Sequence, residues 1–236
     1  MKDLRLATLG GACALVTVVC FVVGIAFMAT SGVQVLIPET GENGLDWIAD
    51  VDAASGLFFV GAWLVILGGL VGLVALVGFY ERLKAAGPWM ILAPILSAVG
   101  LTLVTISHLL PIAIAYELVP GYTGADAATQ ASVAVTFNAF AITSLVLNYT
   151  GDALLWAVVV PLYAFAILKT RALPRWIGWL GLVVAVFAGW LGLLSPASSV
   201  IDGVTFIGFI GFFVFMASMG VALLRRQATA AAAAEG

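Results

Sequence analysis

Charged side chains are scarce in this sequence. Of its 236 residues, only 9% are Asp, Glu, Lys or Arg, and 64% are hydrophobic. A typical soluble domain has about 25% charged and roughly 45–50% apolar residues, so this chain has too few charges to cover a surface that faces water. We therefore expect most of its outer surface to face lipid. Nine Lys and Arg against twelve Asp and Glu also leave no basic face for phosphates, which excludes nucleic-acid binding.

Residue types that catalyse reactions or bind metals are equally rare. The chain has one histidine, His108, and two cysteines, Cys13 and Cys20, which lie in one apolar stretch where a rigid helix keeps them from pairing. It has no HExxH, no CxxC and no glycine-rich phosphate loop. Ser107 and His108 are neighbours in a helix and do not face each other. The sequence therefore predicts no catalytic residue and no metal site, leaves any cofactor unidentified, and favours a protein that is not an enzyme.

Long hydrophobic runs dominate the chain. A bilayer core about 30 Å thick needs roughly 20 apolar residues in a helix, and backbone groups in lipid must pair within their own segment. The sequence therefore predicts an all-α membrane protein with one domain, 1–226, and a disordered cytoplasmic tail at 227–236. Its six transmembrane helices are expected at about residues 6–30, 53–80, 89–116, 150–168, 176–195 and 203–224.

The positions of the cations determine the expected orientation. Lys and Arg concentrate in cytoplasmic loops, and a chain with five or seven spans would divide them between the two sides. Six spans place all nine on one side, namely Lys2, Arg5, Arg82, Lys84, Lys169, Arg171, Arg175, Arg225 and Arg226. Both termini are therefore predicted to be cytoplasmic.

Two segments on the opposite side, 31–52 and 117–149, are longer than turns. The first contains apolar residues at helical spacing, which predict a short amphipathic helix on the surface: Leu45, Trp47, Ile48 and Val51. The second has too many polar residues for a seventh span. Two arrangements suit it: a separate helix resting on the bundle, or a long extension of the fourth span bent near Gly151.

Five ionisable residues are candidates for a site on that outer side. Asp52, Asp152 and Asp202 each precede a span that begins there, and Asp is a favoured N-cap whose charge opposes the helix dipole. Three helix caps are therefore one interpretation. The other is an acidic vestibule, in which these carboxylates join His108 and Glu117.

Glycine and proline recur within the predicted spans. Glycine lets helix backbones approach closely in lipid, which predicts helix-packing positions at Gly68, Gly72, Gly208 and Gly211. Pro111 and Pro161 each remove a backbone donor and can kink a helix. Kinks of this kind occur both in transporters and in purely structural bundles.

Two of the predicted inner loops are alike. Each has two cations, then a proline, then a tryptophan that opens the next span: Arg82, Lys84, Pro88 and Trp89 in one loop, and Lys169, Arg171, Pro174 and Trp176 in the other. Proline at the start of a helix costs no hydrogen bond, and tryptophan anchors span ends at the membrane boundary. Duplication of a helical hairpin and convergent loop chemistry both explain this likeness.

Three features resemble a known group of proteins: the early glycine-rich span, the loop Tyr80–Lys84 and the segment Leu173–Gly181, which reads LPRWIGWLG. The chain resembles six-span bacterial membrane proteins that are classified only as a domain of unknown function. The resemblance covers roughly residues 6–226. It implies a bundle in the bacterial inner membrane, and it implies no activity and no catalytic residue.

The leading functional hypothesis is an accessory or structural membrane protein that binds partner helices, lipid or an apolar ligand. It follows from an interior that is almost wholly apolar and without catalytic groups. Its expected partners are the lipid bilayer and either another membrane protein or further copies of itself. Two alternatives are a small transporter or sensor with an acidic outer vestibule, and the membrane subunit of a quinone-linked oxidoreductase.

Overall fold

The protein is an all-α membrane protein. Its structure, a computed structural model, describes residues 2–33, 36–38, 42–54, 56–197 and 199–235. Six of the described helical segments are long and apolar enough to cross a membrane, at residues 6–30, 57–86, 88–117, 127–170, 175–194 and 203–225. The predicted six-helix architecture is confirmed.

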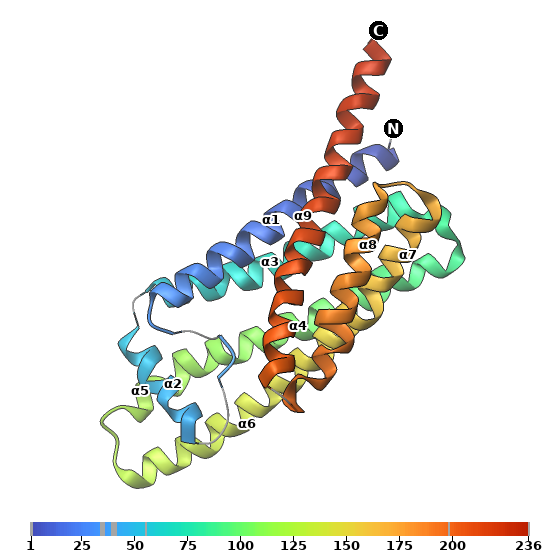
Figure 1. Cartoon of the computed structure of the whole chain (residues 1–236). Helices are drawn as coiled ribbons and strands as arrows, with labels where there is room; N and C mark the ends of the chain where they lie inside the picture. The colour runs from blue at the N-terminus through green and yellow to red at the C-terminus, as the bar shows by residue number, and fades with distance from the viewer. Residues whose placement is uncertain (1, 34–35, 39–41, 55, 198, 236) are drawn as a thin grey trace. The chain divides into compact units, whose positions relative to one another are not determined.

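Several spans combine more than one kind of helix; Figure 1 labels the α-helices. The α-helices are α1 (Lys2–Thr30), α2 (Glu42–Ala53), α3 (Leu57–Leu83), α4 (Leu92–Glu117), α5 (Val119–Tyr122), α6 (Ala127–Asp152), α7 (Val160–Thr170), α8 (Arg175–Val184) and α9 (Ser199–Glu235). Short 3₁₀ helices are η1 (Lys84–Ala86), η2 (Pro88–Ile91) and η5 (Gly192–Ala197), and two π-helices are η3 (Ala153–Val159) and η4 (Ala185–Trp190). The π-helices continue α6 into α7 and extend α8.

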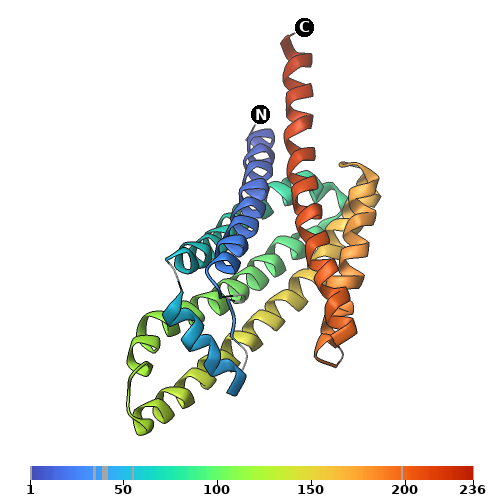
Figure 2. The same cartoon turned by 60° about the vertical axis from the view of Figure 1, so that its left-hand side comes forward.

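The chain divides into two compact units. Unit 1 comprises residues 1–18, 70–102 and 150–236. Its core is one apolar cluster with Phe79, Phe215 and Met219 fully buried. Within this unit α8 and α9 lie side by side in both views (Figures 1 and 2).

Unit 2 comprises residues 19–69 and 103–149. Its core is a second apolar cluster in which the predicted amphipathic helix takes part as α2. The Trp47 ring of α2 lies 6.0 Å from the Phe58 ring and 6.2 Å from the Phe137 ring, measured between centroids. Ile48 and Val51 are buried beside Trp47, while Asp46 and Asp50 are exposed. The prediction of a surface helix with one apolar face is therefore confirmed.

The fourth span is much longer than a membrane. Residues 127–170 form 44 consecutive helical residues, or about 66 Å at the usual rise per residue, whereas a bilayer core is about 30 Å thick. Of the two arrangements open for 117–149, the extension of the fourth span is the one observed, and α6 is not a separate helix. At the place where a bend was expected, the chain passes into the π-helix η3.

The C-terminal residues differ from the prediction of a disordered tail. α9 continues to Glu235. The segment from 227 onward is rich in alanine, the residue with the highest helix propensity, so a helix that has already formed propagates through it at little cost.

Candidate functional site

None of the three predicted helix caps lies at the first position of a span. Asp52 is exposed at the next-to-last position of α2, and the following span begins only at Leu57. A carboxylate at a helix C-terminus faces the negative end of the dipole, so Asp52 does not cap a span. Asp202 is the fourth residue of α9, which begins at Ser199, and its side chain lies outside the part of the chain that the structure describes.

Asp152 does not cap a helix either, so the cap interpretation is wrong for this residue. It lies inside the continuous helix formed by α6, η3 and α7, with helical backbone angles and no capping bond from its side chain. Asp126 caps this helix instead, because its Oδ1 accepts a 2.8 Å hydrogen bond from the Thr129 amide at the start of α6. That bond is the main reason that the pKa of Asp126 lies below its ordinary value.

His108 and Glu117 both belong to α4 but do not face each other. They are nine residues apart in one helix, which corresponds to about two and a half turns and an axial separation of about 13 Å. Their side chains therefore leave opposite sides of α4. His108 is half-buried and Glu117 is exposed. Among the described residues, no group of three or more His, Cys, Asp or Glu lies close enough to hold a metal ion.

The predicted helix-packing glycines differ in how tightly they pack. A Cβ added at Gly208 would overlap the backbone of Ala188, and one at Gly68 would lie 2.8 Å from the Phe21 ring. At Gly211 the nearest atom would be a Val184 methyl at 3.1 Å. At Gly72 every neighbour would be at 3.6 Å, an ordinary contact distance. Gly208 and Gly68 therefore need to be glycine, whereas Gly72 does not.

A second close helix contact in unit 1 could not be predicted from the sequence. α1 and α3 touch through glycines on both helices, so that a Cβ at Gly78 would lie 2.6 Å from the Gly10 Cα. In unit 2 the same pair of helices repeats the arrangement, with Gly24 against Gly61. Only the pairing of two glycines across a seam reveals these positions, and a single sequence does not show which helices are neighbours.

Pro111 leaves a backbone carbonyl without its helical donor in unit 2. Proline has no N–H, so the carbonyl four residues earlier loses its hydrogen bond, and here that carbonyl belongs to Ser107. The buried Ser144 hydroxyl, from α6, donates to the Ser107 oxygen at 2.6 Å. The Ser107 hydroxyl in turn lies 3.3 Å from Asn148 Oδ1. A polar cluster between α4 and α6 thus replaces the bond that the proline removes.

Pro161 creates the same problem in unit 1. The carbonyl four residues earlier belongs to Ala157, and it accepts a 3.0 Å hydrogen bond from the Trp190 indole N–H of η4. The π-helix η3 ends at Val159, two residues before the proline, and its wider turn accommodates the ring, which would clash with that carbonyl in an α-helix. Gly189 lets η4 approach closely, since a Cβ there would lie 2.6 Å from the Trp156 backbone.

The two similar loops of unit 1 bind each other reciprocally. Arg82 donates to the Ala172 carbonyl from both Nε (3.3 Å) and Nη2 (3.0 Å). Lys169 donates to the Ala86 carbonyl at 2.7 Å. In each loop the donor is the first of the two cations, and the acceptor lies two residues before the proline. This matched exchange places both loops at one end of unit 1 and fits either a duplicated hairpin or convergence.

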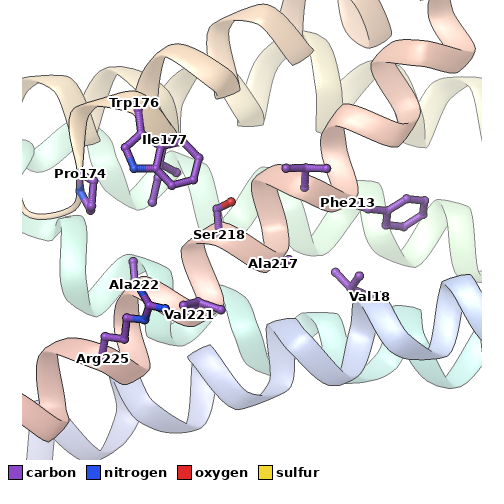
Figure 3. A pocket seen from close by; sticks show the side chains of 11 residues that line it. Val18, Pro174, Trp176, Ile177, Phe213, Ala217, Ser218, Val221, Ala222 and Arg225 are labelled. Atoms are coloured by element: carbon purple, nitrogen blue, oxygen red, sulfur yellow. The ribbon is translucent and has the colours of Figure 1, made fainter.

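A groove opens beside these loops. It has a volume of about 540 Å³ and lies between α1, α8 and α9, wholly within unit 1 (Figure 3). Its walls are apolar, apart from the Ser218 hydroxyl along its length and Arg225 at one end (Figure 3). The remaining walls come from Val18, Pro174, Trp176, Ile177, Phe213, Val214, Ala217, Val221 and Ala222. The volume lies within the range of roughly 300–1,000 Å³ that is usual for ligand sites.

The groove runs from the ends of two spans toward their middle. Arg225 and Trp176 are at the ends of their spans, where cations and tryptophan meet the headgroups. Phe213 is twelve residues from Arg225 along α9, or about 18 Å, and half of a bilayer core is about 15 Å. The groove therefore has the length of one leaflet and a cation at its headgroup end.

Comparison of the chain with protein-family models, with curated proteins and with solved structures found no match. The resemblance noted from the sequence stays a prediction.

Proposed function

We propose that this protein is a non-enzymatic, accessory protein of the bacterial inner membrane that binds an anionic phospholipid from the cytoplasmic leaflet. One acyl chain occupies the groove between α1, α8 and α9, and Arg225 binds the phosphate of the headgroup. The observation that carries the proposal is the leaflet-long apolar groove that ends at an arginine and a boundary tryptophan. Both termini and all nine cations lie on the cytoplasmic side in this arrangement.

The headgroup supplies the selectivity of this site. An acyl chain that enters the groove leaves lipid that is as apolar as the groove itself, so burial of the chain contributes little net free energy. A cation near the headgroups of an anionic leaflet contributes about 1 kcal/mol, and a hydrogen bond between Arg and phosphate is directional as well as charged. Arg225 should therefore distinguish anionic from zwitterionic lipids, while the shape of the groove distinguishes a bound chain from bulk lipid.

Native mass spectrometry of the purified protein tests this directly. The probes are phosphatidylglycerol and phosphatidylethanolamine with identical chains, titrated in detergent. We expect one tightly held phosphatidylglycerol and roughly tenfold weaker binding of phosphatidylethanolamine. Ala217→Phe fills the groove and should abolish the tight site, whereas Val99→Phe adds the same ring at an exposed position of another span and should not.

A charge-matched pair separates Arg225 from general electrostatics. Arg225→Gln and Lys84→Gln remove one positive charge each, but Lys84 forms an ion pair with Glu81 and does not line the groove. Loss of selectivity only in Arg225→Gln supports the proposal. Equal binding of the two lipids by the unmodified protein, or an equal effect of both substitutions, would refute it.

A further inference from the structure

Among the described residues that line the groove of unit 1, Ser218 of α9 alone carries a hydroxyl. Figure 3 shows this side chain on the side of α9 that faces Trp176 and Ile177 of α8. Ser218 is half-buried, and its hydroxyl has no hydrogen-bond partner within the part of the chain that the structure describes. The groove therefore contains an unused hydrogen-bond donor between apolar walls.

Two other hydroxyls of unit 1 bond within their own helices. Ser97 donates to the Ala93 carbonyl at 2.6 Å, and Thr170 donates to the Ala166 carbonyl at 2.7 Å. Both acceptors lie one turn earlier in the same helix, where the hydroxyl of a helical serine or threonine commonly finds its partner. The Ser218 hydroxyl does not use this partner, so its acceptor has to come from the molecule that occupies the groove.

An occupant that is only hydrocarbon at this depth would leave the hydroxyl stranded. Such a chain displaces water from the Ser218 oxygen and offers no acceptor in return. Removal of a hydroxyl from water without a compensating hydrogen bond is unfavourable. The groove therefore favours an occupant with an acceptor at Ser218, and it disfavours a fatty acid whose carboxylate is bound at Arg225, because the rest of that molecule is hydrocarbon.

The spacing of Ser218 and Arg225 matches that of two polar groups in a phospholipid. The two residues are seven apart in α9, which is nearly two full turns, so their side chains leave the same face about 10 Å apart along the axis. A hydrogen bond of about 2.8 Å to the hydroxyl leaves roughly 8 Å to the level of Arg225. In a diacyl phospholipid the ester carbonyls are the first polar groups below the phosphate, and the glycerol backbone that joins them spans a gap of this size.

We infer that the Ser218 hydroxyl donates a hydrogen bond to an ester carbonyl of the bound phospholipid while Arg225 binds its phosphate. This inference rests on the proposed lipid site and adds a second determinant of specificity to it. Arg225 distinguishes the charge of the headgroup, whereas Ser218 distinguishes the linkage of the chain, because an ether-linked analogue with the same headgroup has no carbonyl oxygen.

Native mass spectrometry of the purified protein tests the role of Ser218. The probes are phosphatidylglycerol with two ester-linked chains and its dialkyl ether analogue with chains of the same length. We expect the unmodified protein to bind the diester roughly fivefold more tightly, which is the contribution of one net hydrogen bond, and Ser218→Ala to bind both lipids equally. Equal binding by the unmodified protein, or a preference that survives Ser218→Ala, would overturn the inference.

Ser97→Ala is the matched control. It also removes a serine hydroxyl from unit 1, but that hydroxyl is bonded to its own helix and does not line the groove. The preference for the diester should therefore persist in Ser97→Ala. Its loss in both variants would show that the preference depends on the packing of unit 1 and not on a contact with Ser218.

Infrared spectroscopy gives a second, independent measurement. The probe is phosphatidylglycerol with isotope-labelled ester carbonyl carbons, bound to each protein at one lipid per chain. A hydrogen-bonded carbonyl absorbs at lower frequency, so the shifted band should be present with the unmodified protein and with Ser97→Ala and absent with Ser218→Ala. The same band in all three complexes would contradict the hydrogen bond.

These measurements separate the inference from the proposal on which it rests. If the protein prefers phosphatidylglycerol to phosphatidylethanolamine but binds the diester and the diether equally, the lipid site remains and the role of Ser218 is wrong. If the preference for the headgroup is itself absent, the lipid site is wrong, and the inference fails with it.

Discussion

The two units of this chain carry opposite charge. All nine Lys and Arg fall within the residue ranges of unit 1, and unit 2 contains none. Unit 2 contains seven of the twelve acids, namely Glu39, Glu42, Asp46, Asp50, Asp52, Glu117 and Asp126. The division of the fold into two units therefore follows the division of charge along the chain.

The units share close backbone contact at glycines, such as Gly78 in unit 1 and Gly24 with Gly61 in unit 2, and differ in what is added to it. Unit 1 adds the reciprocal bonds between its two loops. Unit 2 adds an aromatic cluster around Trp47 and hydrogen bonds of Ser144. Each unit also uses a side chain of a neighbouring helix to replace the hydrogen bond that a proline removes.

Close glycine contact should make unit 1 intolerant of a single methyl group. Gly78→Ala places a Cβ 2.6 Å from the Gly10 backbone, so α1 and α3 must separate; overpacking of this kind costs about 1–3 kcal/mol. We expect a clear fall in the midpoint of thermal unfolding in detergent. Gly72→Ala is the control on the same helix, because its nearest neighbours are at 3.6 Å. Equal effects of the two substitutions would show that backbone contact does not hold this pair of helices together.

Ser144 should stabilise unit 2 only because Pro111 leaves the Ser107 carbonyl without a helical donor. Ser144→Ala leaves the buried Ser107 carbonyl unsatisfied, which costs about 1–3 kcal/mol. Pro111→Ala restores a backbone N–H four residues after Ser107, so the cost of Ser144→Ala should shrink in that background. The measurement is a double-mutant cycle on the free energy of unfolding. Additive effects would mean that the serine hydroxyl does not replace the missing bond.

The corresponding double-mutant cycle in unit 1 combines Trp190→Phe with Pro161→Ala. Trp190 is 51% exposed, whereas Ser144 is fully buried, so water can partly replace the indole at the Ala157 carbonyl. The coupling between Trp190 and Pro161 should therefore have the same sign as that between Ser144 and Pro111 and a smaller size.

The spans could be predicted because they depend on length and hydrophobicity, which each segment carries by itself. The caps could not, because the polar residues of 117–149 left open whether the helix that contains Asp152 begins near that residue or much earlier. The hydroxyls of Thr136 and Thr143 instead donate to the Ser132 and Ala139 carbonyls, one turn earlier in the same helix. Polar residues that bond within their own helix do not end it.

The groove depends on which helix faces meet, and a single sequence does not contain that information. Arg225 was used in the sequence analysis only as a topology marker, yet it lies at the end of the groove. Ser218 lines the same groove, and nothing in the sequence distinguishes its hydroxyl from those that bond within their own helix.

The smallest expected effect on stability comes from replacing Asp126 of unit 2 by Asn. The Thr129 amide bond lowers the pKa of Asp126 from its ordinary value of 3.8, so the folded state binds this proton less readily than the unfolded state does. The contribution of Asp126 to stability is therefore full above that ordinary value, and it is lost as the pH falls through the lower, folded one. Asp126→Asn keeps a good N-cap but does not titrate. We expect the unmodified protein to unfold at a slightly higher temperature than this variant above pH 5, with the difference vanishing in acid; a constant difference would show that the cap is not acting through its charge.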